Sequence, residues 1–213
     1  MTTLANKGVL LSIVVPAYQA ERTIRRAVGS VLKLDEEAIE VIVVDDGSTD
    51  GTSVILSSLA TSDPRVKVVA QENRGRSAAR NKGVEVSSGQ WVMFMDADDY
   101  LLASGLSVLL DRCKASDSPL VVFGMRGNGE QRRDARSMDT QADIAYVSAA
   151  TLAKAMLDNY VFDVVDNPGI YETNAVWARL YRRDLLLRLS ELSDGIMAPF
   201  PEGLRFSEDR LLN

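Results

Sequence analysis

The stretches VIVVDDGSTDGT (residues 41–52) and WVMFMDADD (residues 91–99) decide the fold of this chain. Each begins with an apolar run, which is typical of a parallel strand buried on both faces. Each run then ends in closely spaced aspartates. Because open α/β sheets bind ligands at the carboxyl ends of their strands, we expect both acidic groups to border one site. Buried carboxylates need positive or hydrogen-bonding partners, so these groups indicate a metal ion and a polyanionic or polyhydroxylated ligand.

Strand-like and helix-like segments alternate through the first half of the chain. Strands are expected at residues 9–15, 39–44, 66–70, 91–95 and 120–123, and helices at residues 20–34, 52–60, 76–86 and 104–114. This alternation predicts an α/β fold with a mostly parallel sheet flanked by helices.

The regular alternation ends near Gly124. Residues 125–145 are polar and predict either a loop or a pair of edge strands. The pattern beyond them predicts a helix at 148–157, a strand at 176–181 and a helix at 184–192. The closing FSEDRLLN resembles the start of a helix, so we expect the native protein to continue beyond Asn213.

The composition disfavours or excludes several classes of partner, catalytic group and metal site. The 213 residues carry a net charge of −6, which disfavours nucleic acid as a partner because binding it needs a basic surface. The absence of histidine excludes Ser-His-Asp and Cys-His catalysis and His-ligated metal sites. The single cysteine, Cys113, falls in a helical pattern and is interpreted as a packing residue. No apolar run approaches the ~20 residues that span a bilayer.

Two acidic segments are candidates for ligand binding. In DDGS (residues 45–48), a carboxylate can accept a hydrogen bond from a nucleobase N–H or a ribose hydroxyl. The alternative is an acidic turn in which Asp50 caps the next helix. In DAD (residues 96–98), alternate positions leaving a strand can direct two carboxylates to one Mg²⁺ or Mn²⁺ ion. The alternative is a solvated acidic loop.

Two further segments carry charge. ENRGRSAARNKG (residues 72–83) places Arg76 and Arg80 one helical turn apart, so two guanidiniums can face the acidic site or a diphosphate. The alternative is a solvated basic helix face. Glu208 and Asp209 open the last predicted helix, where a carboxylate can serve as a general base. The alternative favoured by these residues alone is that Ser207 caps that helix and the acids meet its positive end.

Taken together, these segments resemble the large family of inverting GT-A glycosyltransferases, family 2. The resemblance is carried in chain order by SIVVPAYQAERTI (12–24), VIVVDDGSTDGT (41–52), ENRGRSAARNKGV (72–84), SSGQWVMFMDADDYL (87–101), WARLYRRDLL (177–186) and FPEGLRFSEDRLLN (200–213). It implies a GT-A fold, a nucleotide-sugar donor, most often a UDP-sugar, and a divalent Mn²⁺ or Mg²⁺ ion.

The resemblance also implies roles for individual residues. On the donor side, these are Pro16, Ala17 and Tyr18 around the nucleoside, Asp46 at the base with Asp45 nearby, Arg80 at the diphosphate or donor sugar, Asp96 at the ribose or metal shell, and Asp98 on the metal. On the acceptor side, Asp209 is the implied catalytic base, with Glu208 and Trp177 near the sugar or acceptor.

The resemblance implies one domain with two regions. Residues 1–115 would form the nucleotide-sugar-binding half, and residues 116–213 a smaller acceptor-side region that is truncated at its C-terminus. The implied setting is polysaccharide or glycoconjugate assembly in the cytoplasm, at the inner face of the membrane, with a glycan or lipid-linked acceptor. The implied reaction is a single inverting displacement, in which a carboxylate takes the proton of the acceptor hydroxyl and the metal stabilises the leaving diphosphate.

Three alternatives stay open at this point. A GT-A domain can bind nucleotide and be catalytically inactive. A receiver-type phosphoacceptor domain also places aspartates at strand ends around Mg²⁺, but here the acidic pair follows the second predicted strand rather than the first. A sugar-phosphate nucleotidyltransferase would carry a Gly-rich, basic loop after the first strand, where this chain has PAYQAERT (residues 16–23).

Overall fold

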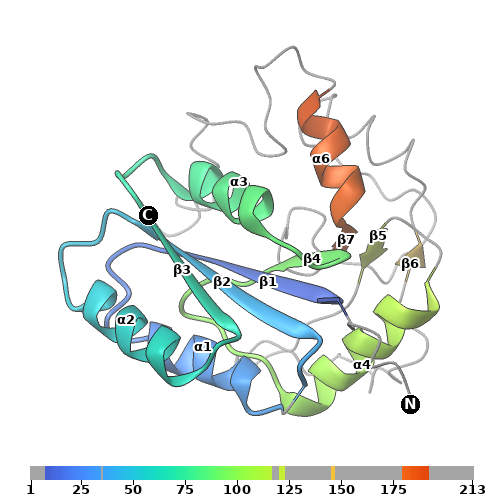
Figure 1. Ribbon diagram of the computed structural model, residues 1–213, viewed down its shortest axis with the longest axis horizontal. Coiled ribbons are helices and arrows are strands. Elements are labelled where there is room, and N and C mark those ends of the chain that lie inside the picture. The colour runs from blue at the N-terminus through green and yellow to red at the C-terminus, as the bar shows by residue number, and fades with distance from the viewer. Residues whose placement is uncertain (1–7, 35, 117–119, 123–144, 147–178, 192–213) are drawn as a thin grey trace, which may run out of the picture.

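The computed structural model of the protein describes residues 8–34, 36–116, 120–122, 145–146 and 179–191. These residues form a mixed seven-stranded sheet in the order β3-β2-β1-β4-β7-β5-β6 (Figure 1). The strands are β1 (Leu11–Ala17), β2 (Ile39–Asp46), β3 (Val66–Gln71), β4 (Trp91–Phe94), β5 (Leu120–Val122), β6 (Ala145–Tyr146) and β7 (Arg179–Arg182). The helices are α1 (Ile24–Leu32), α2 (Thr52–Ser62), α3 (Arg76–Val86), α4 (Ala103–Ala115) and α6 (Arg183–Glu191).

The first four strands form a parallel half-sheet, as the sequence predicts. Strand β1 pairs with β2 on one side and β4 on the other, and β2 pairs with β3. Strand β7 then runs antiparallel between β4 and β5, and β6 pairs antiparallel with β5. The predicted α/β class with a mostly parallel sheet is confirmed.

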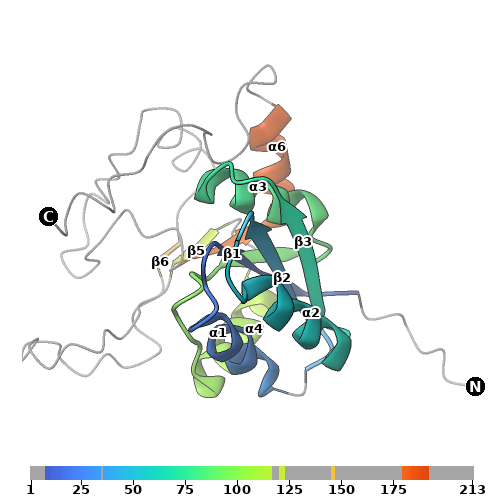
Figure 2. The same cartoon turned by 90° about the vertical axis from the view of Figure 1, so that its left-hand side faces the viewer.

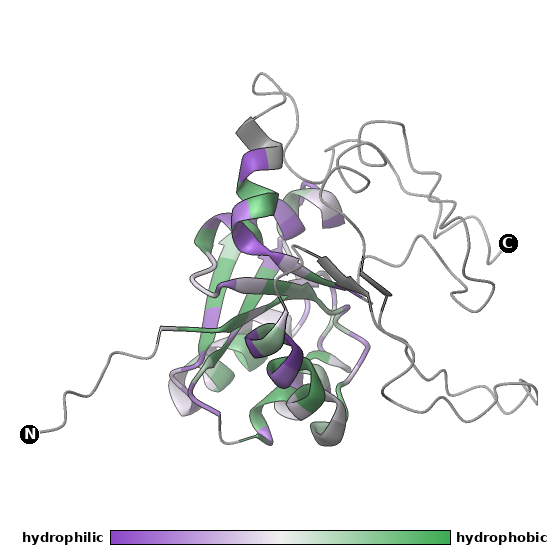
Figure 3. Ribbon diagram, turned by 90° about the vertical axis from the view of Figure 1, so that its right-hand side faces the viewer, coloured by the Kyte–Doolittle hydropathy of each residue, from purple (hydrophilic) through white to green (hydrophobic). Residues whose placement is uncertain are grey.

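Helices cover both faces of the sheet because successive side chains of a strand point to opposite sides. Ile13 and Val41 belong to the core shared with α1, α2 and α4, whereas Val14 and Ile42 pack with α3 and α6. Figures 1 and 2 show these two helical layers on either side of the strands. The central strands are largely apolar, and α6 carries many hydrophilic residues (Figure 3).

Helix α3 lies very close to β1. A Cβ atom built on Gly83 would come within 2.2 Å of the Val14 Cγ1 atom. Ala78 and Ala79 are also buried on this helix. Small side chains on α3 therefore allow the close approach of helix and sheet, which brings Arg80 to the edge of the sheet.

Several predicted boundaries differ from the observed ones by a few residues, and two of them flank the loop after β1. The first strand continues through Pro16 to Ala17, because β4 pairs only as far as Val14 and the missing N–H of a proline is tolerated where a neighbouring strand is absent. The first helix begins at Ile24 rather than at Ala20. The Ala20 N–H donates instead to the Thr52 hydroxyl, which fixes the preceding loop outside the helix.

The later predictions are tested only in part. The expected strand at 176–181 is observed as β7 at Arg179–Arg182, and the helix expected at 184–192 is observed as Arg183–Glu191. Ala145, the last residue of the polar segment, and Tyr146 form the short strand β6. The helix expected at 148–157 lies outside the described residues.

Candidate active site

The site is built at the carboxyl ends of the parallel strands. The pairing of β1 with β2 sets Ala17 beside Asp45, and the pairing of β2 with β3 sets Asp46 beside Gln71. Strand β4 ends at Phe94, one residue before the segment MDADD (residues 95–99). The register thus brings both acidic segments to the same edge of the sheet, as the sequence predicts.

The candidate nucleoside residues differ in exposure. Pro16 and Ala17 are buried within β1, whereas Tyr18 leaves the strand and is 55% exposed. Of these three residues, Tyr18 therefore presents the accessible surface to a ligand at this edge.

Asp46 is buried and holds the loop between β3 and α3. One of its carboxylate oxygens accepts hydrogen bonds from the Gln71 side-chain amide at 2.7 Å and from the Arg74 N–H at 2.9 Å, and the other accepts from the Gly75 N–H at 2.8 Å. Gly47 allows the turn after β2 to lie close to the same loop. Its φ is +76°, and an added Cβ would lie 2.8 Å from the Asn73 nitrogen. Asp46 therefore fixes the entry to α3 from the end of β2.

Asp45 and the β1–α1 loop organise the turn after β2. The Asp45 carboxylate accepts from the Ser48 N–H at 3.0 Å. The Gln19 side-chain oxygen accepts from the N–H groups of Thr49 and Asp50 at 2.9 and 3.1 Å. Gln19 adopts a φ of +51°, which a non-glycine residue rarely does and which recurs at functional sites. The loops after β1 and β2 thus form one hydrogen-bonded unit.

Arg80 links α3 to the acidic segment after β4. Its Nη2 atom lies 3.2 Å from the Asp96 Oδ1 atom, and its side chain is only 5% exposed. A guanidinium in this place offsets the cost of a partly buried carboxylate. It also puts a fixed positive charge at the edge where the acidic segments meet. Arg76, by contrast, is exposed on the first turn of α3.

The segment after β4 concentrates negative charge. Burial raises the pKa of the Asp99 carboxyl, and the charges of Asp96 and Asp98 raise it further, against the lowering effect of Arg26. Asp98 is exposed. Such repulsion among carboxylates favours a cation beside them.

The structure describes only part of the predicted site. It brings together Pro16, Ala17, Tyr18, Asp45, Asp46, Arg80, Asp96 and Asp98 at one edge of the sheet. Trp177, Glu208 and Asp209 lie outside the described residues.

Sequence reasoning missed four side chains that shape these loops: Gln19, Arg26, Ser30 and Gln71. Arg26 and Ser30 could have been noticed in the sequence. They lie one turn apart on a predicted helix, and Ser30 is a polar residue at a buried position of that helix. Gln19 and Gln71 gave none, since their bonds join segments that are distant in sequence.

Residues 12–187 match the family described as glycosyl transferase family 2. This chain belongs to that family. Among its relatives is an uncharacterized glycosyltransferase, EpsJ, of Bacillus subtilis, 30% identical over 204 residues that cover 96% of this chain and 55% of EpsJ. The succinoglycan biosynthesis protein ExoO of Rhizobium meliloti is 30% identical over 203 residues, 95% of this chain and 54% of ExoO. The chain thus spans about half the length of these relatives.

Solved structures show the same fold. The structure of S. aureus TarS residues 1–349 matches 95% of this chain and 53% of its own with a TM-score of 0.68 at 26% identity. The complex of the same TarS region with UDP-GlcNAc matches 95% of this chain and 51% of its own, with a TM-score of 0.64 at 25% identity. The GT-A fold expected from the sequence is confirmed by these neighbours.

The order of the sheet and family membership each remove one of the three alternatives. Receiver-type domains follow the doubly wound order 2-1-3-4-5, whereas this sheet has the order 3-2-1-4 in its parallel half and an antiparallel β7 beside β4. The nucleotidyltransferase alternative fails on the match to a glycosyltransferase family over residues 12–187.

Proposed function

We propose that this family 2 chain transfers a sugar from a UDP-sugar to the hydroxyl of a glycan or lipid-linked acceptor by a single inverting displacement assisted by Mn²⁺ or Mg²⁺. The observation that carries the proposal is the meeting of Asp45, Asp46, Arg80 and the segment 96–99 at one edge of the sheet. The complexes of the structural neighbour TarS with UDP and UDP-GlcNAc support the choice of donor.

Asp96 and Asp98 fit a divalent cation whose coordination a ligand completes. Within the described residues, no cluster of three or more Asp, Glu, His or Cys side chains is arranged to hold a metal ion. Mg²⁺ is commonly held by one or two carboxylates together with substrate phosphates and water, which matches the pair offered here. When bound, the cation would neutralise charge on the leaving diphosphate.

The protein residues supply positioning and proton transfer. Tyr18 offers an exposed ring beside β1 for the nucleoside, and Arg80 holds a positive charge near Asp96 for the diphosphate. Asp209, proposed from the sequence, takes the proton of the acceptor hydroxyl as that oxygen attacks the anomeric carbon. Glu208 and Trp177 are proposed beside the sugar or acceptor.

A lipid-linked acceptor at the inner face of the membrane is part of the proposal. A relative in Campylobacter jejuni, 28% identical over 190 residues, is named as a glucosyltransferase acting on an undecaprenol-linked glycan, and the match covers 81% of this chain and 60% of that enzyme. Among the described helices, none has the length and apolar character needed to cross a bilayer.

Calorimetric titration tests the donor and metal parts. UDP, GDP and dTDP are each titrated into the 213-residue chain with and without Mn²⁺. Of the three nucleotides, UDP is expected to bind tightly, and only when Mn²⁺ is present. Asp98→Asn is expected to remove the metal-dependent part. The control Asp111→Asn changes an exposed carboxylate on α4 and is expected to bind as the wild type does. Equal UDP affinity with and without Mn²⁺ in the wild type would refute metal assistance.

A second measurement separates a transferase from an inactive binding domain. Asp209→Asn is expected to retain metal-dependent UDP binding and to lose release of UDP from the UDP-sugar in the presence of a membrane lipid extract. Glu202→Gln, in the same segment, serves as the control. Turnover in Asp209→Asn equal to that of the control would contradict its role as base, and absence of turnover in the wild type would favour the inactive domain.

A further inference from the structure

Helix α1 holds the segment after β4, residues 95–102, which we call the acidic loop. The Arg26 Nη2 atom donates to the Asp98 carbonyl oxygen at 2.6 Å. The Arg26 guanidinium also lies over the Tyr100 ring, 5.3 Å from its centre. One side chain of α1 therefore contacts both the backbone of Asp98 and the ring of Tyr100.

Ser30 makes a second attachment one turn further along α1. Its buried hydroxyl donates to the Ala27 carbonyl at 2.6 Å and accepts from the Leu101 N–H at 2.9 Å. Since Ser30 is fixed by its own helix, Leu101 is tied to a rigid element rather than to another loop. The acidic loop is thus anchored on α1 at both Asp98 and Leu101.

The Asp98 carboxylate depends on this anchoring more than its neighbour does. Asp96 is held through its side chain by Arg80 at 3.2 Å. Within the described part of the chain, no hydrogen bond or ion pair is recorded for the Asp98 carboxylate, which is exposed. Its position follows from the backbone that carries it, and Arg26 fixes that backbone.

We propose, building on the nucleotide-sugar site proposed above, that Arg26 and Ser30 are positioning residues that hold Asp98 where a divalent cation and a diphosphate meet. Groups that orient metal ligands from outside the coordination sphere commonly change metal affinity by roughly 10–100-fold when they are removed. Neither residue touches the cation or the sugar in this proposal. Both act through the acidic loop.

The charge of Arg26 makes the test decisive. A guanidinium near a cation site repels the cation. If the charge of Arg26 were its only effect, removing the guanidinium would therefore tighten metal binding. Loss of positioning has the opposite effect and weakens metal binding. The direction of the change therefore distinguishes an electrostatic role from a positioning role.

The experiment measures UDP affinity by calorimetry across a Mn²⁺ series for wild type, Arg26→Gln, Arg26→Lys and Ser30→Ala. Arg26→Gln is expected to weaken Mn²⁺-dependent UDP binding by roughly tenfold, with UDP binding in the absence of metal and the melting temperature both unchanged. Arg26→Lys keeps a donor and the charge but loses the planar fork, and is expected to fall between wild type and Arg26→Gln. Ser30→Ala is expected to weaken the same metal-dependent binding.

Arg25→Gln is the matched control. Arg25 is exposed on the same turn of α1 and is equally charged, but no described hydrogen bond or ion pair joins it to the acidic loop. Two results together would overturn the positioning role and leave the proposed function standing. They are Mn²⁺-dependent UDP binding in Arg26→Gln that is as tight as in Arg25→Gln or tighter, and unchanged binding in Ser30→Ala. Absence of Mn²⁺-dependent UDP binding in the wild type would instead overturn the proposed function, and this inference with it.

Discussion

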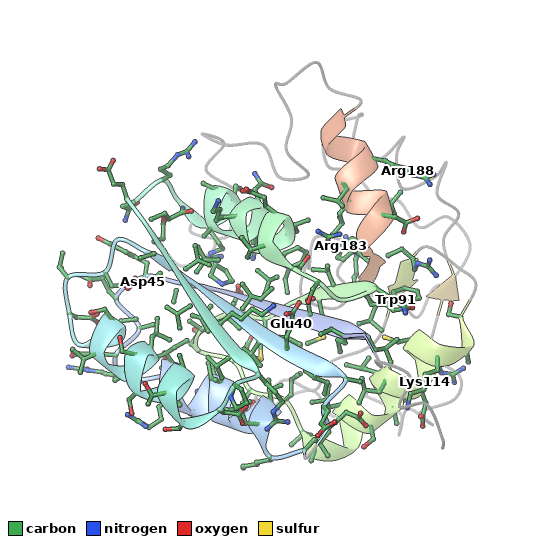
Figure 4. The ribbon with its side chains drawn as sticks, viewed as in Figure 1. Glu40, Asp45, Trp91, Lys114, Arg183 and Arg188 are labelled. Atoms are coloured by element: carbon green, nitrogen blue, oxygen red, sulfur yellow. The ribbon has the colours of Figure 1, made fainter. Side chains whose placement is uncertain are left out.

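Glu40 shows at the scale of a single residue how this sheet accommodates a buried charge. It lies towards the amino end of β2, opposite the end that carries Asp45 (Figure 4). Its carboxylate accepts from the Ser12 hydroxyl, the Ser88 N–H and the Ser88 hydroxyl, and pairs with the Lys67 ammonium at 2.6 Å. With its side chain 3% exposed, Glu40 is stable as a charge because these partners replace water.

The pKa of Glu40 gives this stabilisation a pH dependence. Burial raises the pKa, but Lys67 and the hydrogen bonds of Ser12 and Ser88 together outweigh burial and lower it from 4.5. A carboxyl group whose pKa is lower in the folded than in the unfolded state stabilises the fold. The stabilisation is complete when the pH is above the unfolded-state pKa, and it is lost as the pH falls through the folded-state pKa. The contribution of Glu40 is therefore complete at neutral pH.

Replacing Glu40 by Gln is expected to lower the free energy of unfolding by about 1–3 kcal/mol at neutral pH, because charge-assisted hydrogen bonds to buried donors are lost. The difference from wild type is expected to shrink as the pH is lowered below 4.5. Urea unfolding over a pH series measures it. Glu85→Gln removes a carboxylate from an exposed pair with Lys82 and is expected to cost less than about 0.5 kcal/mol. A difference for Glu40→Gln that stays constant with pH would argue against this assignment.

At the scale of an element, α3 is the helix whose seating matters most to the site. Asp46 fixes its N-terminal loop through Arg74 and Gly75, and Gly83 lets its C-terminal half rest against β1. Arg80, between these two points, then reaches Asp96. The position of Arg80 is thus set by contacts on either side of it along the helix.

Gly83→Ala tests this seating. Alanine is normally favoured over glycine in a helix by about 1 kcal/mol, but here the added methyl would meet Val14 Cγ1 at 2.2 Å. We expect a net destabilisation of about 1–3 kcal/mol from overpacking, measured by thermal or urea unfolding. Gly105→Ala on α4 is the control, because nothing lies within 4 Å of its added Cβ, and it is expected to be neutral or stabilising. Equal effects of the two substitutions would show that α3 yields easily.

At the scale of the whole molecule, Cys113 reports on the integrity of the core. It is the single cysteine of the chain, lies on α4 and is 5% exposed. Burial raises the pKa of its thiol from 9.0 to about 12. Because the thiolate is the reactive form, the folded protein keeps this group both covered and protonated.

Labelling of Cys113 by a thiol reagent at mildly alkaline pH is therefore expected to be slow in the folded chain and complete in denaturant. Its rate in native buffer follows the opening of the core around α4. Raising the urea concentration below the unfolding midpoint is expected to accelerate labelling in step with the unfolded population. Rapid stoichiometric labelling in native buffer would contradict the burial of this thiol.

The sequence predicted those parts of the molecule that depend on local pattern. Apolar runs identified the strands of the parallel half, because a strand buried on both faces needs apolar side chains throughout. Aspartates at the ends of two such runs located Asp45, Asp46, Asp96 and Asp98 at one edge. The insertion of β7 between β4 and β5 was not predictable, since β7 pairs with β4 across about ninety residues of chain and with β5 across about sixty. The grip of Arg26 on the acidic loop likewise arises from tertiary contact.

The placement of β7 has a consequence for how the chain acquires its structure during synthesis. Strands β1 to β4 leave the ribosome in order, and each of β2, β3 and β4 has a neighbour among the strands already made. Strand β5 does not, because its partner towards the centre of the sheet is β7, which begins at Arg179. The nascent parallel half can condense early, whereas β5 must wait for the translation of β7 before it joins the sheet. Late translation thus completes the side of the sheet beyond β4.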